Sequence, residues 1–248
     1  MAKMDIRQAY RNIPIHPSDR VLLGMQWRGA TYVDATLPFG LRSAPIIFSA
    51  LADALQWIME RMGVQWVAHY IDDFITIGDP DSFECKENAV IMHSACDRVG
   101  LPVEPEKDEG PTTTLSFIGI ELDSIALEIR LPRDKLQRLR ETLGSWREKK
   151  SCKKRELLSL IGLLSHACKV VRAGRSFLRR LIDLSTIPKH LDHFVRLNAE
   201  SRSDIEWWVQ YCESWNGIQM MHAGNSGTPV ATVTSDASGS WGCGAYSG

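Results

Sequence analysis

Three acidic residues have the types and the spacing that could support metal-dependent chemistry. Asp72 and Asp73 are adjacent inside the apolar segment WVAHYIDDFITIG, whose β-branched residues predict two short strands with both acids at the hairpin tip. Asp5 lies 67 positions before Asp72, at the end of another expected strand. If the two strands are neighbours, three carboxylates converge, and a divalent cation would relieve their mutual repulsion.

Carboxylate oxygens select particular ions and a particular reaction. They favour Mg²⁺ or Mn²⁺ over Zn²⁺, and no cysteine lies near these acids in the sequence to alter that preference. Two such ions, about 3.5–4 Å apart, can clamp the attacking and leaving oxygens of a phosphoryl transfer. Simple structural roles remain open, because aspartate is also common in turns and at helix N-caps.

The segments around these acids predict an α+β unit with helices on one face of a sheet. Further strands are expected at 21–27, 30–35, 115–122 and 125–129, and helices at 45–62 and 82–99. In the second helix, the positions expected to face inward are Val90, Ile91, Ala95 and Val99. Gly100 is expected to end that helix.

The charges are unevenly distributed, although the net charge of the 248 residues is only −1. Residues 130–180 contain 16 Lys and Arg against 4 Asp and Glu, whereas the rest of the chain contains 13 against 26. Amphipathic helices are expected at 133–149, 153–171, 175–184 and 199–215. Such a basic stretch indicates contact with a polyanion such as nucleic acid, and a solvated helical face is the alternative.

Three tryptophans in the last of these helices, Trp207, Trp208 and Trp215, are expected in the core of a helical bundle. Gly, Asn and Ser then favour a linker at 217–229, and 230–248 predicts two strands around a Gly/Ser-rich turn. Both ends of the chain are expected to belong to larger units, because a motif begins within the first residues and the final hairpin cannot close a core.

Composition excludes several other classes of protein. No apolar run is long enough to cross a membrane, and no signal peptide begins the sequence. The six cysteines are scattered without a CxxC pair, which argues against a disulfide framework or a zinc site. We therefore expect an intracellular protein of the cytoplasm or nucleus rather than a secreted one.

Five segments, MDIRQAYRNIPI, LPFGLRSAP, YIDDF, GLPVEPEK and FIGIEL, resemble the successive palm motifs of reverse transcriptases, in the same order. The later LLSLIGLLSHACKVVRAGRSFLRRLIDLS and TSDASGSWGCGAY resemble DIRS-type retrotransposon polyproteins, in which a ribonuclease H domain follows the polymerase. The resemblance implies a palm (an antiparallel sheet backed by helices) with part of the fingers at 1–130, a helical thumb and connection at 131–216, and a truncated ribonuclease H-like hairpin at 230–248.

The resemblance also implies roles for the acids and their surroundings. Asp5 and Asp72 would be the main ligands of two Mg²⁺ ions, and Asp73 would have a smaller share. Tyr10 falls where an aromatic ring excludes a ribose 2′-hydroxyl, while packing against the sheet is the alternative. Phe39 and Gly40 would line the nucleotide pocket.

Further residues match positions outside the metal site. Lys107 matches a lysine near the pyrophosphate and is a candidate general acid, with an ordinary surface lysine as the alternative. Phe117 and Gly119 would belong to the primer grip, the hairpin that positions the primer end. Asp236 matches the first metal-binding carboxylate of ribonuclease H, whose other carboxylates are absent from this sequence.

Three functions follow from these observations. The first is an RNA-directed DNA polymerase that uses an RNA template, a DNA primer and dNTP, with no signal for an oligomeric state. The second is an inactive remnant that binds nucleic acid or protein, which is favoured because most of the fingers region is missing before Asp5. The third, an RNA-dependent RNA polymerase, is disfavoured because Tyr10 would exclude the 2′-hydroxyl.

Overall fold

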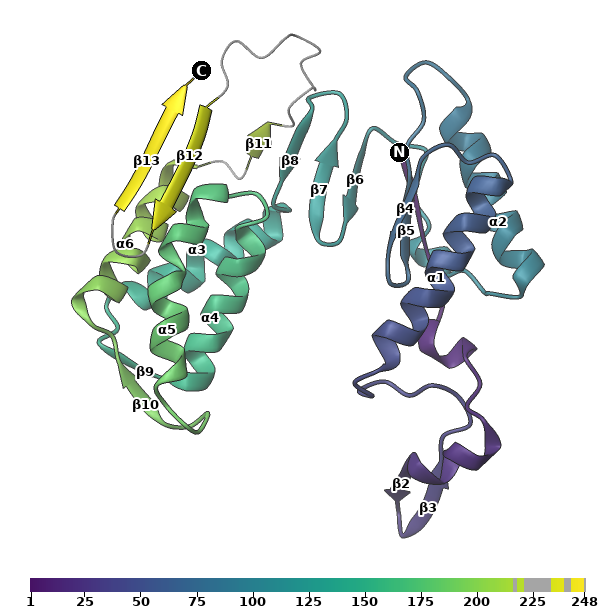
Figure 1. Cartoon of the computed structure of the whole chain (residues 1–248), viewed down its shortest axis with the longest axis horizontal. Coiled ribbons are helices and arrows are strands. Elements are labelled where there is room, and N and C mark those ends of the chain that lie inside the picture. Colours follow the sequence, from purple (N-terminus) through teal and green to yellow (C-terminus); the bar gives the residue numbers. More distant parts are fainter. Residues whose placement is uncertain (216–217, 221–232, 239–241, 248) are drawn as a thin grey trace.

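The computed structural model spans residues 1–248 and describes residues 1–215, 218–220, 233–238 and 242–247. Figure 1 shows two lobes joined by a small sheet: an N-terminal lobe of strands and helices, and a lobe of helices that follows it in the chain. Each lobe has its own buried hydrophobic cluster.

The N-terminal lobe is an antiparallel sheet with helices packed on it. β1 (Ala2–Asp5) pairs with β5 (Asp73–Thr76), which pairs with β4 (Val67–Tyr70), so the strand order is β1-β5-β4. α1 (Ala44–Arg61) packs against β4, and α2 (Glu84–Val99) packs against β1 and β5. This core includes Met4, Ile6, Phe48, Leu55, Met59, Phe74 and Met92. The antiparallel sheet backed by helices is as expected.

The segment between β1 and α1 departs from the expected pair of long strands. η1 (Ala9–Asn12) is a 3₁₀ helix, and a second one, η2 (Pro17–Leu22), takes up the first residues of the expected strand at 21–27. Proline at the first helical position and the His16 side chain, which accepts a hydrogen bond from the Ser18 amide, favour this helical turn. Only β2 (Gly24–Trp27) and β3 (Ala30–Val33) pair as a hairpin.

The α2 helix buries only part of the face that was expected: Ala95 is buried and Ile91 packs against the core, as predicted. Its buried residues are Cys85, Asn88, Met92, Ala95 and Cys96. Val90 and Val99 are instead 63% and 43% exposed, so the prediction was wrong for both. The sequence pattern failed because Asn88 is drawn inward by a hydrogen bond from its Nδ2 to Thr76 Oγ1. Gly100 ends the helix in the left-handed conformation, as expected.

A four-stranded antiparallel sheet joins the lobes. Its strands, in the order β11-β8-β7-β6, are β11 (Ile218–Met220), β8 (Glu128–Arg130), β7 (Ile120–Asp123) and β6 (Thr114–Phe117). The single strand expected at 115–122 is therefore two strands, because Ile118 and Gly119 both have positive φ and form a tight turn. Residues 218–220, inside the expected linker, add the fourth strand.

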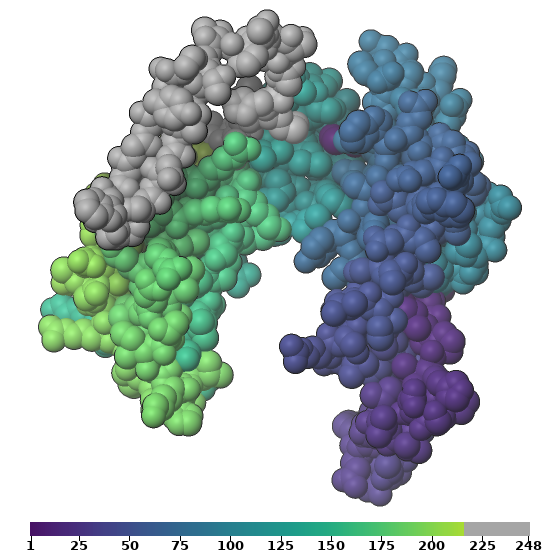
Figure 2. All heavy atoms as spheres, in the orientation of Figure 1, coloured from purple at the N-terminus to yellow at the C-terminus, as the bar shows by residue number. Residues whose placement is uncertain are grey.

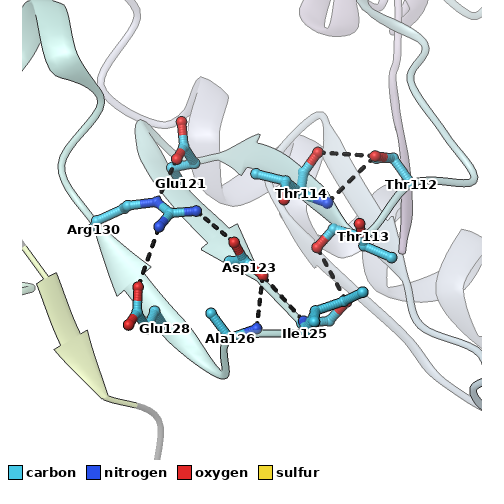
Figure 3. Close-up of polar contacts among 10 residues, drawn as sticks. Thr112, Thr113, Thr114, Glu121, Asp123, Ile125, Ala126, Glu128 and Arg130 are labelled. Atoms are coloured by element: carbon cyan, nitrogen blue, oxygen red, sulfur yellow. Dashed lines mark hydrogen bonds and ion pairs between the residues drawn. The ribbon is translucent and has the colours of Figure 1, made fainter.

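One arginine ties together β7 and β8, the two middle strands of this sheet (Figure 3). Arg130 on β8 donates to Glu121 at 2.5 Å, to Asp123 at 2.6 Å and to Glu128 at 3.2 Å. Asp123 also accepts hydrogen bonds from the backbone N–H groups of Ala126 and Ile125 in the β7–β8 turn. These bonds, the Ala126 bond first, lower the pKa of Asp123 and hold the turn closed.

The second lobe is built from amphipathic helices, as expected. They are α3 (Arg133–Arg147), α4 (Lys154–Ala167), η4 (Arg172–Phe177), α5 (Arg179–Thr186) and α6 (Ala199–Ser214). A short ladder of β9 (Ser151–Lys153) and β10 (Phe194–Arg196) lies at the lobe's end. Its core includes Leu139, Leu157, Leu164, Leu181 and Trp208. Trp207 and Trp215 pack against this core, which confirms the place expected for the three tryptophans.

The remaining described elements are few. η3 (Pro105–Lys107) follows the N-terminal lobe's last helix, and β12 (Val233–Ser238) pairs with β13 (Gly242–Ser247) in the expected hairpin. Residues 221–232, which include most of the expected linker, lie outside the described residues. In the described part of the chain, no helix has both the length and the apolar character needed to cross a bilayer.

Candidate active site

The register of the N-terminal sheet brings the three acids together. Asp5 is the Cα partner of Asp73 in the β1–β5 ladder, and the Ile6 amide donates to the Asp72 carbonyl at 3.0 Å. Strands far apart in the sequence are thus adjacent at the ends that carry carboxylates. This confirms the expectation that Asp5 and the Asp72–Asp73 hairpin tip converge.

The turn that presents Asp72 is strained. β4 and β5 are joined through Ile71 and Asp72, because Tyr70 already pairs with Asp73. Ile71 has φ of 58°, a left-handed conformation that a β-branched residue rarely adopts. Such strain persists only where the surrounding structure enforces it, and it clusters at functional sites. The two-residue turn therefore fixes where Asp72 sits relative to Asp5.

Asp5 is buried and already has a cation beside it. Its side chain is 6% exposed, and its Oδ2 lies 2.8 Å from Nζ of Lys107, which is 102 residues away and 61% exposed. Both residues line a cavity of about 380 Å³, together with Asp73 and Phe117. The cavity opens between β1, η3 and the β6–β7 turn, so a small polar ligand could reach the acids from this side.

Burial and the neighbouring acids raise the pKa of Asp72 and of Asp73. Burial first, then the charge of Asp72 and the contact with Asp5, raise the pKa of Asp73 to about 6. Burial also raises the pKa of Asp72, and the charge of Asp5 adds to the increase. The hydrogen bond to Asp5 raises the pKa of Lys107, so its ammonium stays protonated. The site thus has an excess of negative charge that one lysine only partly offsets.

The donor chemistry fits a hard divalent cation. Asp5, Asp72 and Asp73 supply carboxylate oxygens only, which Mg²⁺ and Mn²⁺ prefer, and the Lys107 ammonium stands in as a cation on Asp5. The side chains are not in a ready coordination geometry, however. Within the described residues, no three His, Cys, Asp or Glu side chains are gathered closely enough to hold a metal ion.

The residues expected at the nucleotide pocket lie apart from this cavity. The rings of Tyr10 and Phe39 are in contact, with centroids 5.3 Å apart, and Tyr10 also meets the edge of Phe48 at 5.8 Å. Phe39 is 66% exposed, and Gly40 follows it with φ of 86°. Tyr10, Phe39 and Gly40 are not among the residues lining the Asp5 cavity. They form a neighbouring aromatic surface on η1 and on the loop before α1.

The β6–β7 turn contacts both the cavity and the helical lobe. Phe117 and Ile118 line the cavity, whereas the Gly119 carbonyl accepts a hydrogen bond of 3.0 Å from Nζ of Lys135 on α3. The side chain of His166 on α4 forms a hydrogen bond with the backbone of Ile118. Burial, followed by the charge of Lys135, lowers the pKa of this histidine.

The sequence did not predict a role for Lys135 or His166, because each occupies an ordinary position in a basic helix. The glycine at position 119 was the one sequence signal of a tight turn, and in the structure it has φ of 73°. A Cβ built at Gly119 would lie 2.0 Å from Lys135 Nζ and 3.1 Å from His166 Nε2. Neither distance could be read from the sequence.

A wide cleft separates the two lobes in the space-filling view (Figure 2). The helices α3, α4 and α5 form the wall opposite α1, and the strands β6–β8 close the top in this view. Asp236, expected to be a ribonuclease H carboxylate, lies on β12 opposite Gly244, and its side chain lies outside what the structure describes.

A family match is found in the N-terminal part of the chain. Residues 1–122, just under half of the chain, match the family described as reverse transcriptase (RNA-dependent DNA polymerase). The match includes Asp5, Asp72, Asp73 and Lys107. No curated protein matches the sequence.

Solved structures share the fold over most of the chain. A foamy viral protease–reverse transcriptase in complex with an RNA/DNA hybrid aligns with 86% of this chain and 27% of its own length, with a TM-score of 0.63 and 16% identity. The same viral enzyme in complex with dsDNA aligns with 96% of this chain and 46% of its own length, with a TM-score of 0.65. The chain thus spans less than half the length of these structural relatives, and it shares their polymerase fold.

Proposed function

We propose that this chain is an RNA-directed DNA polymerase that adds deoxynucleotides to the 3′-hydroxyl of a DNA primer on an RNA template. The observation that carries the proposal is the pairing of Asp5 with Asp73 beside the strained Ile71–Asp72 turn, inside the part of the chain that matches reverse transcriptases. Three carboxylates held at one sheet end are suited to phosphoryl transfer.

Asp5 and Asp72 would hold two divalent ions, with a smaller contribution from Asp73. When bound, these ions would neutralise the triphosphate and activate the primer hydroxyl. Reverse transcriptases generally use divalent metal ions, and the three carboxylates provide the matching donors. Lys107 would leave Asp5 on metal binding, and its ammonium could then donate a proton to the departing pyrophosphate.

The other expected residues would position the substrates. Tyr10, packed between Phe39 and Phe48, would exclude a ribose 2′-hydroxyl by its bulk. Phe117 and the Gly119 turn would support the primer end, and Lys135 and His166 would hold that turn against the helical lobe. These four residues would therefore link the position of the helices to that of the primer.

The cleft between the lobes would hold the template–primer duplex. The structural relatives are described in complex with an RNA/DNA hybrid and with dsDNA, which supports a duplex partner of the same kind here. The basic helices between 131 and 216 would act as thumb and connection and contact phosphates without reading sequence. We further propose the DIRS-type subgroup, with β12–β13 and Asp236 as the start of a ribonuclease H domain.

A primer-extension assay with a homopolymer RNA template, dNTP and Mg²⁺ or Mn²⁺ tests the proposal. Asp72→Asn should lower extension by roughly a thousandfold or more, because it removes a ligand that acts in the transition state. The exposed Asp97→Asn on α2 is the matched control and should leave extension unchanged. Tyr10→Ala should relax the exclusion of ribonucleotides.

A second candidate is binding of nucleic acid without catalysis. The Asp5–Lys107 ion pair favours it, because a lysine held on the key carboxylate competes with a metal ion. In that case, the unmodified chain and Asp72→Asn would bind an RNA–DNA hybrid equally, and neither would extend a primer. Extension by the unmodified chain alone would exclude this candidate.

A further inference from the structure

A concavity of about 670 Å³ lies where β10 leads into α6, at the side of the helical lobe away from the N-terminal lobe (Figure 1). Its lining residues are Lys150, Arg196, Leu197, Asn198, Ala199 and Arg202. Half of them are cationic and none is acidic. The volume is within the range of about 300–1,000 Å³ that is usual for small-molecule sites.

Backbone hydrogen bonds hold the three cations around this concavity. Arg196 is the Cα partner of Ser151 in the β9–β10 ladder, and the Leu197 amide donates to the Lys150 carbonyl at 2.9 Å. The Arg202 amide donates to the Asn198 carbonyl at 3.1 Å, in the first turn of α6. The backbone positions of all three cations are therefore fixed before any ligand arrives, which lowers the entropy cost of binding.

These cations are also unpaired, unlike their neighbours. Arg147 pairs with Glu206 at 2.8 Å, and Lys149 pairs with Glu156 at 2.9 Å. Within the described residues, no carboxylate lies within ion-pair distance of the Lys150, Arg196 or Arg202 side chain. Three like charges around one concavity repel each other, so an anion bound among them would relieve the repulsion.

We propose that Lys150, Arg196 and Arg202 form a phosphate-binding pocket, distinct from the proposed polymerase site. The planar guanidinium groups can each bind a phosphate through two parallel hydrogen bonds, and the lysine adds a mobile ammonium. The phosphates would come from a nucleic-acid strand that extends beyond the cleft or from a free polyphosphate. The pocket does not depend on the Asp5 site, which lies in the other lobe.

Binding measurements without divalent ions test the pocket independently of polymerase activity. The full chain is titrated with inorganic tripolyphosphate, with a short RNA–DNA hybrid, and with a hybrid that has a long single-stranded extension. The variants are Lys150→Gln, Arg196→Gln and Arg202→Gln, and the control is the exposed Lys86→Gln on α2. Thermal unfolding checks that each variant is folded.

Each arginine variant should weaken binding by about tenfold, because it removes charge-assisted hydrogen bonds to phosphate. For nucleic acid, the slope of log K against log salt should fall by roughly one for each lost contact. Weaker binding of tripolyphosphate would identify a free polyphosphate as the ligand. Weaker binding of the extended hybrid alone would identify a nucleic-acid strand.

Two outcomes would overturn the proposal. The first is unchanged affinity of all three pocket variants for every probe. The second is an equal loss in Lys86→Gln, because the effect would then follow from net charge alone. Neither result depends on whether the chain extends a primer, so failure of the pocket and failure of the polymerase assignment remain distinguishable.

Discussion

Asp5 in the N-terminal lobe and Asp204 in the helical lobe make nearly the same contact. Both side chains are almost fully buried, at 6% and 2% exposure, and each has one oxygen 2.8 Å from an exposed cation. Lys107 is the partner of Asp5, and Arg180 is the partner of Asp204. Distance and burial alone would therefore assign the two pairs the same role.

Their surroundings separate them. Asp5 faces a cavity that it shares with Asp73, and Asp72 lies in the adjacent turn. Asp204 lies in an apolar core beside Ile205 and Trp208, and its second oxygen has no hydrogen-bond partner among the described residues. We infer that a buried ion pair can exchange its cation for a metal ion only where a cavity gives access and further acids attract the ion.

The largest effect on stability is expected from Arg180→Met. It would leave Asp204 buried and unpaired, at a cost of about 3 kcal/mol in the free energy of unfolding. Lys107→Met should cost about 2 kcal/mol in metal-free buffer, because the cavity lets water reach Asp5. Denaturant unfolding with and without Mg²⁺ measures both. Mg²⁺ should restore most of the loss in Lys107→Met and none in Arg180→Met.

The effect of metal ions on Lys107→Met and Arg180→Met tests whether Asp5 and Asp204 differ in this way. Mn²⁺ binding by the unmodified chain and by Lys107→Met gives a second measurement, and the variant should bind more tightly because its lysine no longer competes. If Mg²⁺ stabilises both variants to the same extent, the distinction between the two aspartates is wrong. Unchanged Mn²⁺ affinity in Lys107→Met would show that the lysine does not occupy the metal position.

Gly174→Ala tests how tightly the core around Asp204 is packed. A Cβ at this position would lie 2.3 Å from the Trp208 ring, which is fully buried one turn after Asp204. Because neither the ring nor the backbone can move freely, the variant should lose about 2 kcal/mol of stability. Gly144→Ala is the control, since a Cβ there meets no atom within 4 Å, and it should be neutral or stabilising.

Gly119→Ala should lower the stability less. Gly119 lies in the β6–β7 turn, which contacts the helical lobe through Lys135. The positive φ of this residue costs an alanine about 1 kcal/mol, while the Lys135 ammonium is at the end of a flexible chain and can move aside. Urea unfolding gives the stability. If the turn also supports the primer, kcat for extension should fall more than the affinity for the hybrid, and a proportional fall in both would contradict that role.

Asp73→Asn should have the smallest effect on the free energy of unfolding, and this effect should depend most clearly on pH. The pKa of Asp73 is raised from 3.8 to about 6, so the folded state binds this proton more tightly than the unfolded state does. The stabilisation is present below about pH 4 and is lost as pH rises through 6. In metal-free buffer at pH 7, Asp73→Asn should therefore gain up to about 1 kcal/mol, since partial exposure screens the repulsion.

Unfolding curves from pH 4 to pH 7 test this sign. The unmodified chain should lose stability across that range more steeply than Asp73→Asn does. If the variant loses stability more steeply, the folded state stabilises Asp73 as a carboxylate. The site would then not carry the excess negative charge inferred above.

The local pattern of the sequence predicted several elements, and it failed at specific places. The β-branched run around Asp72 predicted the hairpin, and the apolar spacing of α3, α4 and α6 predicted their positions. The pattern held at Ile91 and Ala95 but failed at Val90 and Val99, because the Asn88–Thr76 hydrogen bond draws the Asn88 side of α2 inward. It also missed the turn at Ile118 and Gly119, since a short hairpin inside an apolar stretch has the composition of one strand.

Sequence alone determined the identity of the chemistry-bearing groups: three acids, a candidate lysine and a basic stretch whose residues could be counted. It also indicated that Asp5 and Asp72 would converge, because strand periodicity and motif order constrain neighbouring segments. Only the tertiary structure decided that Lys107 lies on Asp5, that Lys135 reaches Gly119, and that Arg196 and Arg202 meet around one concavity. These contacts depend on how separately formed elements pack, and no local periodicity encodes the distance between side chains from different elements.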